Sequence, residues 1–206
     1  FCSRRENDMK ELTPRQKKTN EMKRRIYDVF CRLTVENEGD VTVKDICDGA
    51  GISVGSFYHL FDSKEAVTEE LYQYQSEDMA SRVYPEDPDE KIRAVLEDVL
   101  RLSMDKGVYF MKMATVYETQ HSSSIAQVSG EGPVFDSATA RLLTEALEAG
   151  SSQGRYTLTK PAWYYADMMI FLFRSVLLFW QVSDGNFDAL QAMKNYTETI
   201  LDMLRR

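Results

Sequence analysis

Apolar residues recur every three or four positions along most of the chain, and this is the period of an α-helix. The helix expected over residues 15–36 carries on one face Met22, Ile26, Val29, Phe30 and Leu33. No stretch shows the convincing alternation of apolar and polar residues that marks a half-buried strand. The sequence therefore predicts an all-α protein of about nine helices, and its 206 residues are enough to bury a core.

Capping residues and glycines indicate where the next helices begin and end. Thr42 followed by Asp45 is an acidic variant of the capping box, so a second helix is expected to follow. The Gly-Ala-Gly stretch at 49–51 is predicted to form a tight turn, after which Ser53 caps a third, short helix. Two short helices joined by a tight turn, after one longer helix, are typical of a helix-turn-helix arrangement.

The rest of the chain continues the helical pattern. Further helices are expected from Asp89 to Gly107, from Tyr109 through Tyr117, from Val134 to Ala149, from Thr159 to Val182 and from Asn186 to Leu204. Residues 121–133 are predicted to form a loop. The most apolar run, 168–182, is shorter than the roughly 20 residues of a membrane span, so it is predicted to be a buried helix. The start of the chain shows no leader-like segment. A cytoplasmic protein without a membrane partner is expected.

Charge is unevenly distributed along a chain of net charge −8. Residues 1–33 hold ten Lys or Arg against five Asp or Glu, whereas residues 65–206 hold thirteen against twenty-two. A basic N-terminal part on an acidic body indicates that only the first part meets a polyanion. The alternative is an ordinary solvated basic helix face.

The stretch ISVGSFYHLFDSKE, residues 52–65, has the composition of a recognition helix and the turn after it. Small residues at 53, 55 and 56 let the backbone approach base edges in a major groove, and Val54 can contact a thymine methyl group. Tyr58 and His59 can donate hydrogen bonds to phosphate oxygens, while Phe57 and Phe61 are expected to point inward. Lys64, at the start of the next helix, is expected to bind a phosphate. The alternatives are an ordinary short helix and a solvated lysine.

The same residues resemble the tetracycline-repressor (TetR) family of bacterial transcription regulators. The residues that match the family's motif in order are Thr42, Ile46, Ala50, Gly51, Ile52, Ser53, Gly55, Ser56, Phe57, Tyr58, Phe61, Lys64 and Glu65. Cys47 departs from the alanine usual there, and Asp28-Val29 departs from the small residues usual in the first helix. The resemblance implies a flexible segment at 1–14, a DNA-binding domain at 15–63 and an effector-binding and dimerisation domain at 64–206, with 64–84 as the connecting helix.

The resemblance also implies a function and its residues. The chain is expected to be a repressor that binds a near-palindromic DNA operator as a homodimer and is released by a small-molecule effector. The residues expected to contact DNA are Thr42, Ser53, Val54, Gly55, Ser56, Tyr58, His59 and Lys64. Those expected to line an effector pocket, with ordinary core packing as the alternative for each, are Met104, Tyr109, Met113, Tyr117, Trp163, Met168 and Phe171.

The last two helices are expected to pair with those of a second subunit. The residues assigned to this dimer interface are Asp167, Arg174, Leu178, Leu190, Met193, Tyr196 and Ile200. Arg174 lies within an apolar run, and a buried charge needs a partner. Its predicted partner is Asp167 of the second subunit, and the alternative is an anionic effector.

Enzymatic chemistry is not indicated by the sequence. There are two histidines, and no metal-ligand spacing, phosphate loop or nucleophile motif, so neither a metal nor a cofactor is expected. Three cysteines without paired spacing indicate neither a disulfide framework nor a zinc site, and they fit a reduced cytoplasm. Two alternatives stay open, namely a regulator controlled by a protein partner without a ligand, and an all-α adaptor or enzyme that does not bind DNA.

Overall fold

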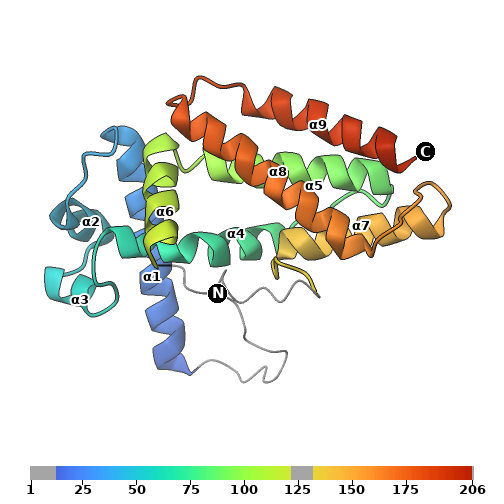
Figure 1. The fold of residues 1–206 in the computed structure, drawn as a ribbon. Helices are drawn as coiled ribbons and strands as arrows, with labels where there is room; N and C mark the ends of the chain where they lie inside the picture. Colours follow the sequence, from blue (N-terminus) through green and yellow to red (C-terminus); the bar gives the residue numbers. More distant parts are fainter. Residues whose placement is uncertain (1–12, 122–131, 206) are drawn as a thin grey trace. The chain divides into compact units, whose positions relative to one another are not determined.

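Capping side chains and glycines set the helix boundaries in the computed structural model, which describes residues 13–121 and 132–205. Within these residues the chain forms nine α-helices, one 3₁₀-helix and no strand (Figure 1). In chain order they are α1 (Pro14–Glu36), α2 (Val43–Ala50), α3 (Val54–Tyr58), η1 (Glu65–Glu69), α4 (Glu70–Ala80), α5 (Pro88–Met104), α6 (Val108–His121), α7 (Ala138–Ser152), α8 (Ala162–Val182) and α9 (Ala189–Leu204). The predicted all-α class is confirmed.

Two of the predicted caps are present as hydrogen bonds. Thr42 Oγ1 accepts the backbone N–H of Asp45 at 3.2 Å, and the Asp45 carboxylate accepts the Thr42 N–H at 2.9 Å, which completes the capping box. Ser53 Oγ accepts the backbone N–H of Ser56 at 3.1 Å. The turn predicted at 49–51 is shorter than expected, because α2 continues to Ala50 and the left-handed conformation begins at Gly51, with φ of 61°.

The start of α7 differs from the prediction. The helix begins at Ala138 rather than Val134, and Ser137 caps it. The backbone N–H groups of Val134 and Phe135 instead donate to the Asp167 carboxylate, at 2.8 and 3.4 Å. A carboxylate on a distant helix therefore holds this segment in a non-helical conformation.

The start of α8 also differs. The sequence predicts Thr159 as the cap of this helix, but the helix begins at Ala162 after Pro161, and no side chain caps it. The backbone N–H of Thr159 donates to the Tyr165 hydroxyl at 3.1 Å, so a tyrosine from the first turn holds the preceding loop. The loop predicted at 121–133 lies mostly outside the described residues.

The chain divides into two compact units, and the boundary between them does not fall at residue 63, where the DNA-binding domain is predicted to end. Among the described residues, unit 1 contains 13–74 and 106–121, and unit 2 contains 75–105 and 132–205. The predicted DNA-binding domain therefore shares its unit with η1, the start of α4 and α6, which the sequence assigns to the C-terminal domain.

Unit 1 has a core of aromatic side chains between α1, α4 and α6. The ring of Tyr27 meets those of Tyr74 and Phe110 edge to face, with centroids 4.9 and 5.6 Å apart. Phe30 contacts Phe110 in the same way at 5.6 Å. Such pairs add to the hydrophobic stabilisation of a core. They fix α6 against the helix that precedes the helix-turn-helix.

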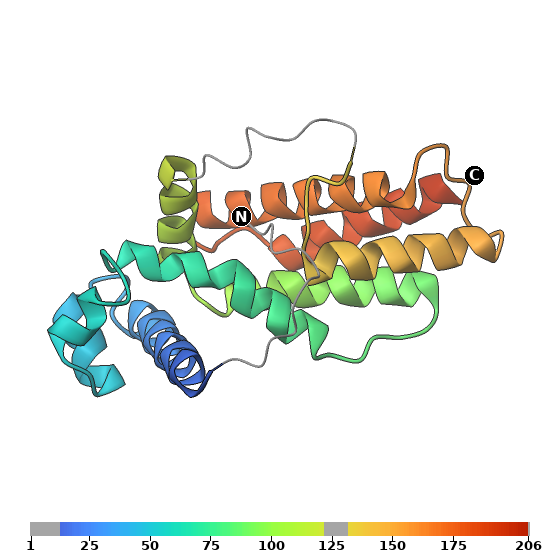
Figure 2. The ribbon, with the colours of Figure 1, turned by 90° about the horizontal axis from the view of Figure 1, so that it is seen from below.

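Unit 2 is built around four long helices. In this unit α5 packs against α7 and α9, and α8 packs against α7 and α9, which gives a bundle (Figure 2). Apolar residues at helical spacing, such as Val95 and Leu96 on α5 and Leu143 and Leu147 on α7, are fully buried in it. The bundle is the hydrophobic core expected of the C-terminal part.

Helix α8 is the one helix of the described residues that is long and apolar enough to cross a membrane by length and composition. Half of its most apolar window is nevertheless buried against its neighbours in unit 2. Asp167 and Gln181 are among its buried residues. These features are those of a core helix, as the sequence predicts.

Candidate nucleic-acid interface

A glycine determines how closely α1 and α2 pack. A Cβ atom added at Gly49 would lie 2.8 Å from Cγ1 of Val29 on α1. Glycine inside a helix costs about 1 kcal/mol relative to alanine. Its presence near the end of α2 therefore follows from the short distance between the two helices, on which the placement of α3 depends.

Gly51 and Ser53 set the direction in which α3 leaves α2. Gly51 adopts left-handed backbone angles, which glycine tolerates best, and the next N–H, of Ile52, donates to the carbonyl of Cys47 at 3.0 Å. Ser53 then caps α3, and its hydroxyl lies 2.9 Å from that of Ser56. The chain thus turns sharply between two short helices, as in a helix-turn-helix.

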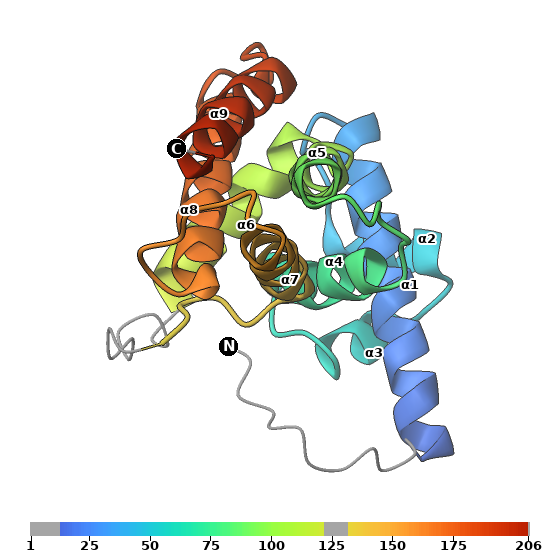
Figure 3. The same cartoon turned by 90° about the vertical axis from the view of Figure 1, so that its right-hand side faces the viewer.

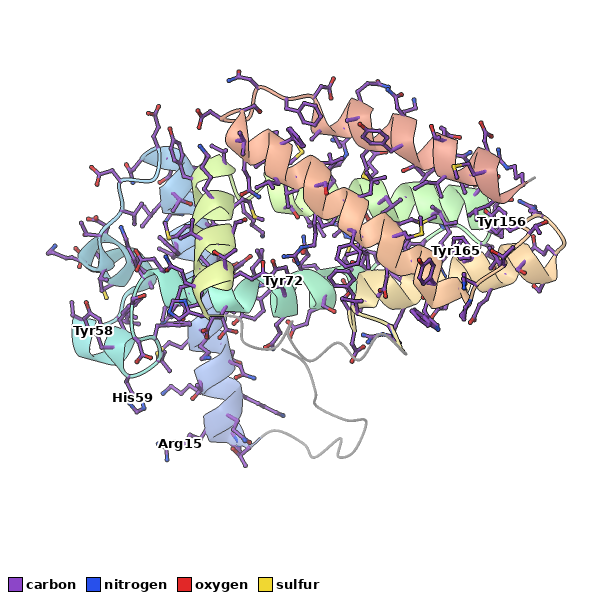
Figure 4. All side chains as sticks on the ribbon, in the orientation of Figure 1. Arg15, Tyr58, His59, Tyr72, Tyr156 and Tyr165 are labelled. Atoms are coloured by element: carbon purple, nitrogen blue, oxygen red, sulfur yellow. The ribbon has the colours of Figure 1, made fainter. Side chains whose placement is uncertain are left out.

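The five-residue helix α3 has one buried and one exposed face. Phe57 is fully buried and lies 5.8 Å, centroid to centroid, from the buried ring of Phe61, so both point inward as predicted. On the outer face, Val54 is 45% and Tyr58 53% exposed, and His59 is exposed beside them (Figure 4). The ring of Tyr58 meets that of Phe57 edge to face at 5.5 Å, and about half of its surface, like that of Val54, is available to a partner.

The outer face of α3 is suited to a major groove. Ser53 and Gly55 are exposed and small, so the backbone can come close to base edges. Val54 offers a methyl surface, and Tyr58 and His59 offer hydrogen-bond donors. The structure thus brings together on one surface five of the eight residues predicted to contact DNA.

Like Ser53, the other three predicted DNA contacts are hydrogen-bonded within the chain. Thr42 and Ser56 take part in the caps of α2 and α3. Lys64 is half-buried, and its ammonium donates to the carbonyl of Val41 at 2.8 Å, which ties the start of η1 to the start of α2. Since an ammonium has three N–H donors, its predicted contact with a phosphate stays possible beside this bond.

Unit 1 also contains side chains that support the helix-turn-helix from α6, and the sequence did not reveal them. Tyr117 donates to Glu69 at 2.8 Å and Tyr72 donates to Glu118 at 2.6 Å, so hydroxyls and carboxylates join α6 to η1 and α4. Tyr117 and Glu69 are 48 residues apart in the sequence, and Tyr72 and Glu118 are 46 residues apart. No local signal in the sequence indicates such a pairing.

The cysteines of unit 1 are packing residues. Cys31 and Cys47 are buried, at 8% and 2% exposure. Burial raises the pKa of Cys31 to about 12, so its thiol stays protonated near neutral pH. The hydroxyl of Tyr27, within the aromatic core, is buried and has no hydrogen-bond partner among the described residues.

The residues predicted to line an effector pocket are distributed over both units. Tyr109, Met113 and Tyr117 belong to unit 1, whereas Met104, Trp163, Met168 and Phe171 belong to unit 2. Tyr109 packs on the turn after α1, where a Cβ added at Gly39 would be 3.0 Å from its ring. Met168 and Phe171 are about half exposed on α8. The set therefore includes structural contacts and surface residues.

The residues assigned to the dimer interface also separate into two groups. Leu178 and Tyr196 are exposed at 46% and 47%, as an interface requires. Met193 is 2% exposed because it faces the core of its own unit. Asp167 is 5% exposed, and its carboxylate accepts two backbone N–H groups of its own chain.

Arg174 is half-buried rather than enclosed in the core. Its guanidinium lies 6.0 Å from the centre of the Phe135 ring, a cation–π contact within its own chain. Both side chains thus contact the segment before α7 within their own chain, and the pairing of Arg174 with Asp167 of a second subunit stays a prediction.

Comparison with known proteins agrees with this geometry. Residues 39–71, which contain α2, the turn and α3, match the family model described as "Bacterial regulatory proteins, tetR family". The matched region is the one that carries the helix-turn-helix, and the all-α fold agrees with this similarity. The match covers 33 of the 206 residues, so the helix-turn-helix of this chain is similar to that of the tetR family.

Solved structures share the fold at low sequence identity. The TetR-family regulator PfmR of Thermus thermophilus is 20% identical, with a TM-score of 0.57 over 88% of this chain and 100% of that one. A putative TetR-family regulator of a Rhodococcus species is 14% identical, with a TM-score of 0.59 over 90% and 100%. FadR of Bacillus subtilis, solved in complex with stearoyl-CoA, is 18% identical, with a TM-score of 0.53 over 86% and 97%. No curated protein sequence matches the chain.

Proposed function

We propose that this regulator is a cytoplasmic repressor that binds a near-palindromic operator as a homodimer and is released by a small-molecule effector. The observation that carries the proposal is the pair of exposed surfaces that the two units present. Unit 1 exposes the outer face of α3, which suits a major groove. Unit 2 exposes a stripe of apolar side chains, which suits a second copy of the chain.

The apolar stripe follows the length of α8. Tyr164, Met168, Phe171, Leu178 and Val182 are 44–71% exposed, and they are separated by four, three, seven and four residues. With the seven-residue interval counted as two turns, the spacing averages about 3.6 residues, so these side chains follow one face of α8. On α9, Tyr196 and Met203 are exposed as well, at 47% and 65%. Apolar surface of this extent on a helix pair favours burial against another subunit.

A two-fold dimer would place two copies of α3 on DNA. Symmetry then requires two inverted half-sites, about 10 base pairs or a little more apart from centre to centre. Within each half-site Val54 would contact a thymine methyl, and Tyr58 and His59 would hold the phosphates beside it.

The effector is the least constrained part of the proposal. The similarity in fold to Bacillus subtilis FadR, whose structure holds stearoyl-CoA, makes a long-chain acyl-CoA the first compound to test. An effector that weakens operator binding 5- to 150-fold needs a coupling free energy of about 1–3 kcal/mol. If operator and stearoyl-CoA bind together without weakening each other, this compound is not the effector.

Selection of bound sites from a random double-stranded DNA pool tests the proposal. We expect a recovered palindrome from protein that is dimeric by sedimentation. A pool without a consensus at moderate salt, from folded dimeric protein, would contradict the operator-binding repressor. If a palindrome is recovered but no small molecule releases the protein from it, a regulator controlled by a protein partner is favoured.

A further inference from the structure

The helix-turn-helix of this chain is acidic, although DNA is a polyanion. Residues 39–71 contain seven Asp or Glu and two lysines. One of the lysines, Lys44, pairs with Asp48 at 2.6 Å, and the other, Lys64, donates to the carbonyl of Val41. Contacts between cations and phosphates supply most non-specific affinity for DNA. The motif that reads the bases therefore needs cations from elsewhere in its unit.

The first half of α1 has the opposite charge and almost no role in the core. Residues 14–25 hold six Lys or Arg and one Glu, and the fully buried residues of α1 begin only at Ile26. By helix rise this segment is about 18 Å long. Thr13 and Gln16 form a capping box at its start, so the helical conformation is encoded locally.

Three of these cations lie on one face of α1. Arg15, Lys18 and Arg25 follow one another at intervals of three and seven residues, which places them on one face of the helix. We call them the cationic row. All three are exposed, and none of them forms an ion pair with the residues that the structure describes. Lys23 and Arg24 of the same segment are, by contrast, paired with Glu70 and Asp28.

The cationic row and the recognition helix lie at the same end of unit 1. Figures 1 and 3 show the start of α1 projecting at the end of the unit where α3 lies. Figure 4 shows Arg15 at the tip of α1 on the side of Tyr58 and His59. A duplex that enters α3 with its major groove is therefore close to the cationic row.

We propose that the cationic row binds the phosphate backbone that flanks the bases read by α3, and that it supplies most of the electrostatic affinity of this regulator for DNA. The inference rests on the proposed operator binding and deepens it. Arg15 and Arg25 are about 15 Å apart by helix rise, while duplex DNA carries one charge per about 1.7 Å of axis, so several phosphates lie within reach. These contacts position the protein and read no sequence.

The test is the salt dependence of DNA binding by the full chain with Arg15→Ala and Lys18→Ala. The dissociation constants for the selected operator and for a random duplex are measured from low to moderate salt. The slope of log Kd against log salt should fall by about 0.9 for each phosphate that the protein no longer neutralises, up to about 3.6 for the four side chains of a dimer. Both duplexes should be affected to the same extent, because phosphate contacts read no sequence.

Two control variants complete the test. Arg101→Ala with Lys160→Ala removes one arginine and one lysine exposed on unit 2 and should leave the slope unchanged. Arg15→Lys with Lys18→Arg keeps both charges and should keep the slope, which separates the effect of charge from any loss of helix.

An unchanged slope for the alanine variant would overturn the inference while operator binding stands. So would weaker binding to vesicles of anionic lipid with an unchanged DNA slope. A parent chain that binds no duplex even at low salt would refute operator binding itself.

Discussion

Replacing Gly150 by alanine should destabilise unit 2, although alanine is the better helix former. Gly150 lies in α7, and a Cβ added there would be 2.1 Å from Cε2 and 2.3 Å from Cδ2 of the Tyr156 ring. The ring cannot move away easily, because Tyr156 is 4% exposed and its hydroxyl donates to the Asp89 carboxylate. The backbone N–H of Tyr156 also donates to the Gly150 carbonyl, at 3.3 Å.

In the Gly150→Ala chain, a gain in helix propensity opposes the cost of overpacking against the Tyr156 ring. Alanine gains about 1 kcal/mol of helix propensity over glycine. Overpacking costs about 1–3 kcal/mol, and the loss of a hydrogen bond to a charged group costs about 1.5–3 kcal/mol if the ring is displaced. With the ring displaced, the net effect is a destabilisation of about 1.5–5 kcal/mol.

The assay for this variant is urea unfolding followed by circular dichroism at one fixed protein concentration. A double-mutant cycle with Tyr156→Ala supplies the control, since alanine at position 150 should be tolerated once the ring is absent. A Gly150→Ala chain as stable as its parent, or more stable, would show that the close contact between α7 and the following segment does not exist.

Three further predictions follow from individual contacts. Hydrogen bonds from Arg155 lower the pKa of Asp87 below its ordinary 3.8. The ionised Asp87 therefore stabilises the folded unit above about pH 4, and this contribution is lost as the pH falls below that value. Unfolding measured at a series of acid pH values should show the loss. The Asp87→Asn variant should lack this pH-dependent contribution. Leu178→Glu should give monomers by sedimentation, whereas the same change at Val83, which is 99% exposed, should leave the dimer intact. Lys64→Ala should destabilise unit 1 by about 1–2 kcal/mol in thermal melts, because η1 loses its bond to the start of α2. Its salt slope should fall as well only if the ammonium also reaches a phosphate.

The features that the sequence predicts well are those with local causes. The caps at Thr42 and Ser53 depend on residues within three positions, and the inward direction of Phe57 follows from helical spacing. The fold class follows from the same periodicity. The candidate DNA-binding face could be identified because small residues, a turn and two caps lie within one short stretch.

The features that could not be predicted depend on contacts between distant residues. The sequence places Asp167 at a subunit interface, but it lies 33 residues from the N–H group of Val134 that it binds. The same contact delays the start of α7. The assignment of α6 to unit 1 depends on aromatic packing between Phe110 and residues of α1. Periodicity shows that such a helix has a buried face, but it does not show which helix covers that face.

The central claim is that the exposed face of α3 reads base pairs, and a repeated site selection with Val54→Asn tests it most directly. Val54 is 45% exposed, so the change should leave the fold intact. Asparagine prefers the edge of adenine, whereas valine offers only apolar contact to a thymine methyl. We predict a palindrome that differs from the parent's at one symmetric position in each half-site. An unchanged consensus, with binding retained, would contradict the placement of α3 in the major groove.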